Sequence, residues 1–189
     1  METKNSLFIS SLKSGLIIGV VSIVVFIVMY VADIKPVGII MPFVIMIIAV
    51  AINIAILVVL LKKYRTEIGG FISFRNAFLY CFIALVTSAV ISTIFTLLFI
   101  QFIEPEYYKN IMEAQKAYME NYLSGKMSEE QIAQSLDKMD AQMAKMGSVS
   151  STLKGLLGNI VVGGIVALIV GAIMKKNPDV FDNKAGGVI

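Results

Sequence analysis

The sequence predicts an all-α membrane protein with four transmembrane helices and an extracytoplasmic helical hairpin between helices three and four. Two observations lead to this fold class. The chain of 189 residues is 58% hydrophobic and has a mean hydropathy of +0.85, whereas soluble domains are about 45–50% apolar. The excess apolar residues are also collected into four long uncharged runs, which charged segments separate.

Each of the four runs is long enough to cross a membrane as a helix, because the hydrocarbon core requires about 20 mainly apolar residues. The runs occupy residues 14–32, 36–61, 76–103 and 155–174. No A-x-A-like cleavage site follows the first run, and the run is longer than the apolar core of a signal peptide. We therefore expect an uncleaved first helix and a single membrane domain over residues 1–189.

The segment FISFRNAFLYC, residues 71–81, stands between the second and third runs. Gly69 and Gly70 are expected to end the second helix, and Ser73 is placed to cap the first free amides of the third. Arg75 and the phenylalanines are typical of residues that fix the depth of a helix at the membrane interface. These phenylalanines are Phe71, Phe74 and Phe78. A ligand pocket is the alternative, but no acid or histidine accompanies them.

Small or polar residues recur at every fourth position of two spans. Such stripes let helix backbones approach closely, which favours packing between helices in lipid. The stripe of the third span is Ala84, Ser88, Ser92 and Thr96, and that of the fourth is Gly155, Asn159, Gly163, Ala167 and Gly171. We predict that these two spans pack on each other, or on a second copy, through the stripes. Gly15 and Gly19 form a weaker pair in the first span, and Asn53 is expected to bond to a neighbouring helix.

The segment between the third and fourth spans has the pattern of a helical hairpin at about 105–147. Pro105 suits the first turn of a helix, Gly125 interrupts that helix, and the sequence SEEQ at 128–131 is a capping box. The second helix carries a narrow apolar seam, whereas the apolar arc of the first is about half of the helical wheel. The seam consists of Ile132, Leu136, Met139, Met143 and Met146, and one side of the arc is Tyr107, Ile111, Tyr118 and Tyr122.

The other side of the arc consists of Met112, Met119 and Leu123. If the tyrosine side covers the seam, this methionine strip is left over and forms an adaptable partner surface. Alternatively, the strip rests on lipid headgroups or on the outer ends of helices one and two.

Basic residues gather on one side of the predicted bundle. They are Lys4 and Lys13 before the first span, Lys62, Lys63, Arg65 and Arg75 between the second and third, and Lys175 and Lys176 after the fourth. Residues 104–154 contain eight acids and six lysines. Because short cytoplasmic loops carry the surplus of Lys and Arg, we expect both termini in the cytoplasm and the hairpin outside.

The composition also argues against several functions. The chain has no histidine and a single cysteine, Cys81, which removes the usual zinc, haem and iron–sulfur ligand sets, so we expect no cofactor. A net charge of +3, with its basic residues beside the spans, does not indicate nucleic acid. Proton coupling would require ionisable residues in the central part of a span, and none lies there. No nucleophile has a base at a meaningful spacing, so we expect no enzyme.

Several stretches resemble a known family. They are YRTEIGGFISFRNAF, FIEPEYYKNIMEAQ, GKMSEEQIAQSLDKM and a glycine-rich last span that ends IMKKNP. In order and spacing they are similar to the bacterial four-helix membrane family known as domain of unknown function 4199. The resemblance implies a multi-pass protein of the bacterial inner (cytoplasmic) membrane. It supplies no catalytic residues, because none are established for the family.

Two hypotheses for function remain. The first is a non-enzymatic scaffold or accessory subunit whose outer hairpin contacts another membrane or periplasmic protein, or a second copy of itself. The second is a small oligomeric carrier or channel, for which the Ser and Thr residues of the third span and Asn53 are the support. In either case the lipid bilayer is a partner.

Overall fold

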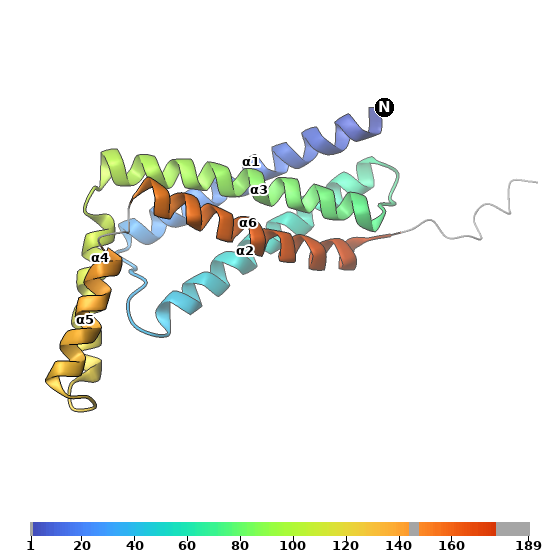
Figure 1. Cartoon of the computed structure of the whole chain (residues 1–189). Helices are drawn as coiled ribbons and strands as arrows, with labels where there is room; N and C mark the ends of the chain where they lie inside the picture. The colour runs from blue at the N-terminus through green and yellow to red at the C-terminus, as the bar shows by residue number, and fades with distance from the viewer. Residues whose placement is uncertain (1, 144–147, 177–189) are drawn as a thin grey trace, which may run out of the picture.

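The computed structural model describes residues 2–143 and 148–176, and it is built from helices and loops (Figure 1). The elements are α1 (Glu2–Val31), α2 (Met41–Glu67), α3 (Phe74–Leu98), the π-helical turn η1 (Phe99–Ile103), α4 (Tyr107–Leu123), α5 (Glu129–Met143) and α6 (Val149–Met174). By length and composition, α1, α2, α3 with η1, and α6 are able to cross a membrane. The all-α membrane fold with four spans is therefore confirmed.

The ends of the spans differ from the sequence expectation at several points. α2 begins at Met41 and not at Pro36, because the preceding loop contains Gly38 with a positive φ of 94° and Pro42 occupies the first helical turn. α1 and α6 begin before the expected positions 14 and 155. In α6 the reason is Ser148, whose side chain accepts a hydrogen bond from the Ser151 amide and starts the helix.

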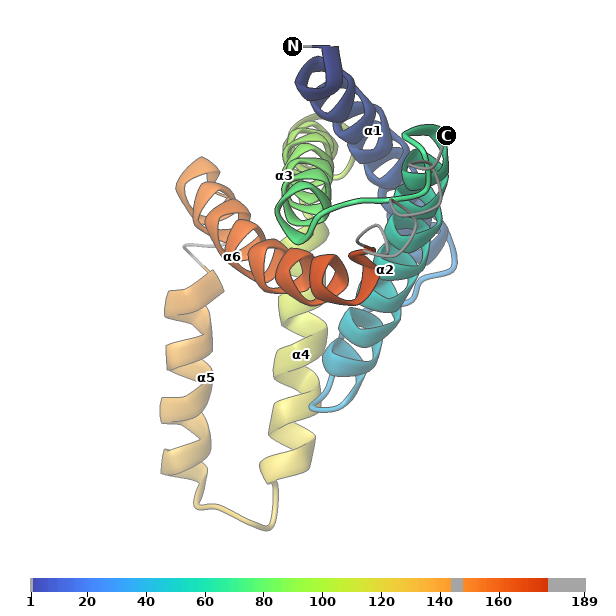
Figure 2. The ribbon, with the colours of Figure 1, turned by 90° about the vertical axis from the view of Figure 1, so that its right-hand side faces the viewer.

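α3 is the central helix of the bundle, since it packs along α1 on one side and along α6 on the other. α6 crosses α3 at an angle and approaches α2 towards its C-terminal end (Figure 2). α2 meets the other spans mainly through its second half, where Leu57, Leu61 and Tyr64 are buried. Phe43 and Ile47 in its first half are exposed. The bundle is therefore closed towards the α2–α3 loop and open towards the α1–α2 loop.

The packed core lies in the closed half. Tyr80 is its largest fully buried side chain, and its ring stacks on Tyr64 with centroids 4.8 Å apart. The Tyr80 hydroxyl shares a hydrogen bond with Ser14 of α1 and donates to the Leu60 carbonyl of α2 at 3.3 Å. Because a buried phenol needs such partners, this one residue connects three helices.

The closed end of the bundle is fastened by the backbone. Ile72 and Lys176 exchange two N–H···O hydrogen bonds of 2.9 Å, and Arg65 donates to the Met174 carbonyl at 3.1 Å, where a cation also favours the negative end of the α6 dipole. The Ser73 side chain accepts from the Asn76 amide at 3.4 Å, so the predicted cap of the third span is confirmed. Gly69 and Gly70, after α2, have φ of 97° and 85°, as predicted.

Phe78 does more than mark the membrane interface. It is half-buried, and its backbone and Cβ lie against Gly171 of α6. Its ring stacks between Phe74 and Phe82, at centroid distances of 6.4 and 5.7 Å. The row of rings therefore forms part of the packing between α3 and α6, in addition to the interfacial role that the sequence predicts for Phe78.

The predicted hairpin is present as α4 and α5, which run across the end of the bundle (Figures 1 and 2). The capping box forms, since the Gln131 amide donates to Ser128 Oγ at 3.4 Å and the Ser128 amide donates to Gln131 Oε1 at 3.3 Å. Gly125 makes the turn with a φ of 77°. Met146, at the expected end of the second helix, lies outside the described residues.

Candidate functional site

The hairpin is joined to the bundle by a cluster of aromatic rings, which we call the joint cluster. Its members are Phe26, Tyr30, Phe95, Phe99 and Tyr107. Phe26 and Tyr30 of α1 each lie 5.0 Å from the buried Phe99 ring, edge to face. Tyr107 of α4 lies 5.5 Å from both phenylalanines. Edge-to-face pairs contribute about 0.5–1.5 kcal/mol beyond their buried area, so the first residue of α4 is firmly held.

The π-helical turn places Phe99 in this cluster. The Glu104 amide donates to the Phe99 carbonyl at 2.9 Å, across five residues and not the four of an α-helix. Such a turn inserts an extra residue into the helix and often occurs at functional positions. Here it ends the third span and turns the chain into α4.

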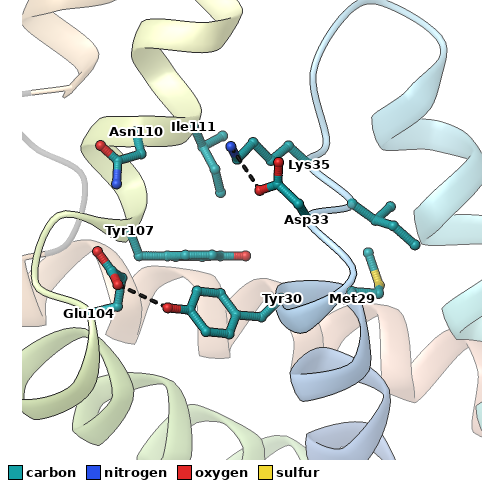
Figure 3. A pocket seen from close by; sticks show the side chains of 9 residues that line it. Met29, Tyr30, Asp33, Lys35, Glu104, Tyr107, Asn110 and Ile111 are labelled. Carbon is teal, nitrogen blue, oxygen red and sulfur yellow. Dashed lines mark hydrogen bonds and ion pairs between the residues drawn. The ribbon is translucent and has the colours of Figure 1, made fainter.

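A cavity of about 210 Å³ lies beside the joint cluster (Figure 3). The Tyr30 hydroxyl donates to Glu104 Oε2 at 2.9 Å, and Lys35 Nζ lies 2.9 Å from Asp33 Oδ1. Asn110 of α4 also lines the cavity. Glu104, which follows η1, thus has a partner in α1, and Asp33 and Lys35 pair with each other within the α1–α2 loop.

A second contact fixes α4 to the α1–α2 loop. The Gly38 amide donates to Gln115 Oε1 at 2.6 Å, and a Cβ on Gly38 would lie 3.3 Å from the Tyr118 ring. Because Gly38 also has a positive φ, a side chain there would be strained and crowded. The loop therefore fits against two successive turns of α4.

Burial also affects the tyrosines at the start of α4. Desolvation raises the pKa of Tyr107 and of Tyr108 above the ordinary value of 10.0, because the phenolate loses its hydration when it is buried. Among the residues that the structure describes, no three His, Cys, Asp or Glu side chains are close enough together to hold a metal ion.

α3 and α6 pack on each other, and two glycines of the α6 stripe lie at this contact. At Gly171 a Cβ would be 3.0 Å from the Phe78 amide nitrogen, so the two backbones approach closely there, and at Gly163 a Cβ would be 3.4 Å from Leu85 Cβ. Ala167 is fully buried between these two contacts. The residues of α3 that face these glycines are thus Phe78 and Leu85.

The stripe of α3 faces α1 at Ala84 and the space between α3 and α6 at Ser92 and Thr96. Ala84 is fully buried and its carbonyl oxygen approaches Gly15 of α1, the glycine with the least free space. Ser88 is buried, and it lines a cavity among the spans. The remaining stripe residues line cavities in the open half: Ser92, Thr96, Gly155 and Asn159. The predicted bond of Asn53 is confirmed, since Ser22 donates to its Oδ1 at 3.1 Å.

The methionine strip of α4 is not an uncovered surface. Met112 is 7% exposed, while Met119 and Leu123 are half-buried. The strip flanks Lys116, whose Nζ lies 2.6 Å from Asp140 Oδ1 of α5, so these residues face α5. The exposed aromatic side chains of α4 are instead Tyr118 and Tyr122. The prediction that the strip is left over is therefore wrong at Met112.

Sequence reasoning did not identify the residues that join the hairpin to the bundle, namely Tyr30, Phe99, Glu104 and Gln115. One feature pointed towards them, because aromatic residues gather at the ends of membrane spans. The sequence places Tyr30 at the end of one predicted span and Tyr107 just after another. Because the predicted topology puts both tyrosines on the same side of the membrane, a contact between them could have been expected.

A family model described as "Protein of unknown function (DUF4199)" matches residues 13–176. No curated protein and no solved structure matches the chain. The matched segment includes α1 from residue 13 onward, the other three spans, the hairpin and the joint cluster. The chain belongs to the DUF4199 family.

Proposed function

We propose that this member of the DUF4199 family is a non-enzymatic scaffold or accessory subunit of the bacterial inner (cytoplasmic) membrane, and that its hairpin binds a protein partner outside the cytoplasm. The observation that carries the proposal is the rigid joint. α4 is fixed to two spans by aromatic contacts and to the α1–α2 loop by Gln115, so the bundle holds the hairpin at a defined angle. A fixed angle is useful when a surface must be presented to another molecule.

The partner face of the hairpin is acidic. Glu106, Glu113 and Glu120 are exposed and recur every seven residues. At about 100° per residue they lie on the side of α4 opposite the bundle-facing Gln115 and beside Lys116, whose Nζ pairs with Asp140 of α5. Residues 104–143 contain eight acids and four lysines. We therefore propose a partner with a basic surface, since complementary charge guides association and selects partners.

The proposed orientation has both termini in the cytoplasm and the hairpin outside. It is supported by the basic residues Lys62, Lys63, Arg65 and Arg75, which lie at the closed end together with Lys175 and Lys176, because short cytoplasmic loops carry the surplus of Lys and Arg.

Site-specific photo-crosslinking in intact cells tests the proposal. A photoreactive residue at Glu120, on the acidic face, is expected to give an adduct, whereas the same residue at the buried Met112 is expected to give none. Glu113→Lys should abolish the Glu120 adduct because it reverses a charge that lies about two helical turns away on the same face. An adduct of twice the 20.6 kDa chain mass would identify a second copy as the partner. Absence of any adduct from Glu120, or an adduct indifferent to Glu113→Lys, would contradict the proposal.

A carrier or channel is the second candidate, and the cavities lined by Ser88, Ser92 and Asn159 favour it. Against it, Leu57, Leu61 and Tyr80 are fully buried and fill the closed half of the bundle. A path through one chain would have to displace them. Flux of solutes into liposomes that contain the purified protein distinguishes this candidate from a scaffold.

A further inference from the structure

Two neighbouring cavities occupy the open half of the bundle. The first, about 360 Å³, lies between α3, α6 and the start of α4, and we call it the head chamber. The second, about 300 Å³, lies among all four spans, and we call it the tail chamber. Ser92 and Asn159 line both chambers, so they form the neck between them.

The chambers exist because α3 and α6 separate towards the hairpin. At Gly171 a Cβ would lie 3.0 Å from the Phe78 amide nitrogen, and at Gly163 it would lie 3.4 Å from Leu85 Cβ. At Gly155, two turns further towards the hairpin, a Cβ would meet no atom within 4 Å. The space is therefore a consequence of the helix crossing, and Gly155 lines it without filling it.

The lining of the head chamber is rich in hydroxyl groups. Its polar side chains are Ser92, Thr93, Thr96, Tyr108, Ser151 and Thr152, together with the Asn159 amide at the neck. Among the residues that the structure describes, no Asp, Glu, Lys or Arg lines either chamber. A phosphate headgroup would be bound poorly here, since phosphate recognition relies on Arg, Lys or backbone amides.

Several of these polar groups have no partner among the described residues. Within residues 2–143 and 148–176, the side chains of Ser92, Thr93, Tyr108 and Asn159 make no hydrogen bond. Asn159 is exposed on α6 (Val149–Met174), near the middle of the span, so in a bilayer its amide would lack a polar partner, which costs about 2–7 kcal/mol. A molecule in the two chambers that supplies donors and acceptors would offset this cost.

The tail chamber is mainly apolar. Met46, Val50, Ile54, Leu85, Val162 and Val166 supply most of its wall. Asn53 and Ser22 also reach it, but they are already bonded to each other. We call the two chambers together the groove. The groove changes from hydroxyl-rich to apolar along the direction in which a membrane lipid lies.

We infer that the groove between α3 and α6 binds a lipid with an uncharged, hydroxyl-bearing headgroup, such as a monoacylglycerol. Its glycerol hydroxyls bond to Thr93 and Tyr108 in the head chamber, and its ester oxygens accept from Asn159 at the neck. Its acyl chain lies along the apolar wall of the tail chamber. The inference does not depend on a protein partner of the hairpin.

Photolabelling of the full-length protein in nanodiscs tests this inference. The probe is a monoacylglycerol with a diazirine in its acyl chain, and the comparison probe is a phosphatidic acid with the same chain. We expect the monoacylglycerol to label residues of α2, α3 and α6 around the tail chamber, and the phosphatidic acid to label them several-fold less. Equal labelling by the two probes would show that the groove binds hydrocarbon alone and would overturn the assignment of the headgroup.

Gly155→Phe and Gly158→Phe form a matched pair of variants. Both glycines have no atom within 4 Å of an added Cβ, but only Gly155 lines a chamber. Gly155→Phe should reduce specific labelling at least about tenfold, which corresponds to a loss of about 1.4 kcal/mol or more of binding free energy. Gly158→Phe should leave the labelling unchanged. Equal labelling of the two variants would overturn the inference.

Asn159→Leu keeps the test decisive if Gly155→Phe fails to fold. The substitution removes no hydrogen bond within the described residues and makes the span more apolar, so the protein should insert and remain monodisperse. It should nevertheless lose monoacylglycerol labelling by several-fold while the weak phosphatidic acid labelling stays the same. Full monoacylglycerol labelling of Asn159→Leu would contradict the role of the neck.

Discussion

Gly15 is the position at which the bundle has least room for a side chain, and adding one methyl group there tests the packing of α1 on α3. A Cβ at Gly15 would lie 2.5 Å from Thr87 Cβ and 2.6 Å from the Ala84 carbonyl oxygen, whereas ordinary contacts begin near 3.4 Å. Gly15→Ala therefore requires α1 and α3 to separate locally by about 0.8–0.9 Å, the shortfall of those two distances.

The cost of this separation can be bounded. A gap of about 0.5–1 Å forfeits a quarter to a half of the dispersion energy between facing atoms, and overpacking a well-packed interior typically costs about 1–3 kcal/mol. The upper end applies here because a backbone oxygen cannot rotate away as a side chain can. The higher helix propensity of alanine returns about 1 kcal/mol, so we expect Gly15→Ala to lower the free energy of unfolding by about 2 kcal/mol.

Gly158→Ala is the matched control, because an added Cβ there meets no atom within 4 Å. It gains the same helix propensity without the clash and should be slightly more stable than the wild type. The assay is unfolding of the purified protein by sodium dodecyl sulfate in mixed micelles, followed by circular dichroism. Gly15→Ala should unfold at a lower detergent fraction than the wild type. If it unfolds together with Gly158→Ala, the close approach of α1 and α3 is wrong.

Two further predictions concern topology and pH. Reporter fusions after Lys63 should give cytoplasmic signals and fusions after Gly125 external ones, and an external signal from Lys63 would overturn the orientation. Because burial raises the pKa of Tyr107 and Tyr108 above 10.0, the unfolded state loses these protons first. The stabilisation is present below pH 10 and is lost as pH rises through the raised pKa values. The midpoint temperature of thermal unfolding, measured between about pH 8 and 11, should therefore fall more steeply with pH for the wild type than for the double variant Tyr107→Phe with Tyr108→Phe. Parallel curves for the two proteins would refute this.

The elements of the fold were predictable because their determinants are local. Hydropathy over about 20 residues identifies a span, and the side chains of Ser73 and Ser128 cap the helices that directly follow them. Gly70 and Gly125 end helices through their own φ angles. None of these effects depends on which helices later become neighbours, so one sequence was sufficient.

The partners of the helices were not predictable in the same way. A glycine marks a place of close approach, but it does not say whether a second glycine or a large side chain faces it. Gly171 meets Phe78, and Gly15 meets Thr87. The crossing angles of α3 with its two neighbours decide this pairing, and crossing angles depend on side chains far apart in the sequence.

The two faces of α4 illustrate the same limit. The tyrosine side and the methionine side have the same helical period, so periodicity alone does not show which of them meets α5. The choice is made by two polar contacts with distant residues, the pair of Lys116 with Asp140 and the hydrogen bond of Gly38 to Gln115. On the wheel Lys116 lies at the edge of the methionine strip, beside Leu123, and a charge in this position indicates that the strip borders a partner helix.

The joint and the groove share one turn of helix, and this connects the two proposals. Tyr107 packs in the joint cluster, while the next residue, Tyr108, lines the head chamber. A lipid that holds Tyr108 would also hold the start of α4 against the bundle, and by linkage a partner that stabilises this position of α4 would strengthen lipid binding by the same factor. The polar residues of the spans fit this division. Ser14 and Ser22 are bonded to Tyr80 and Asn53 and hold the helices together, whereas the unpaired ones surround the space beside Tyr108. A lipid that binds in the open half of the bundle can therefore change how firmly the bundle holds the hairpin.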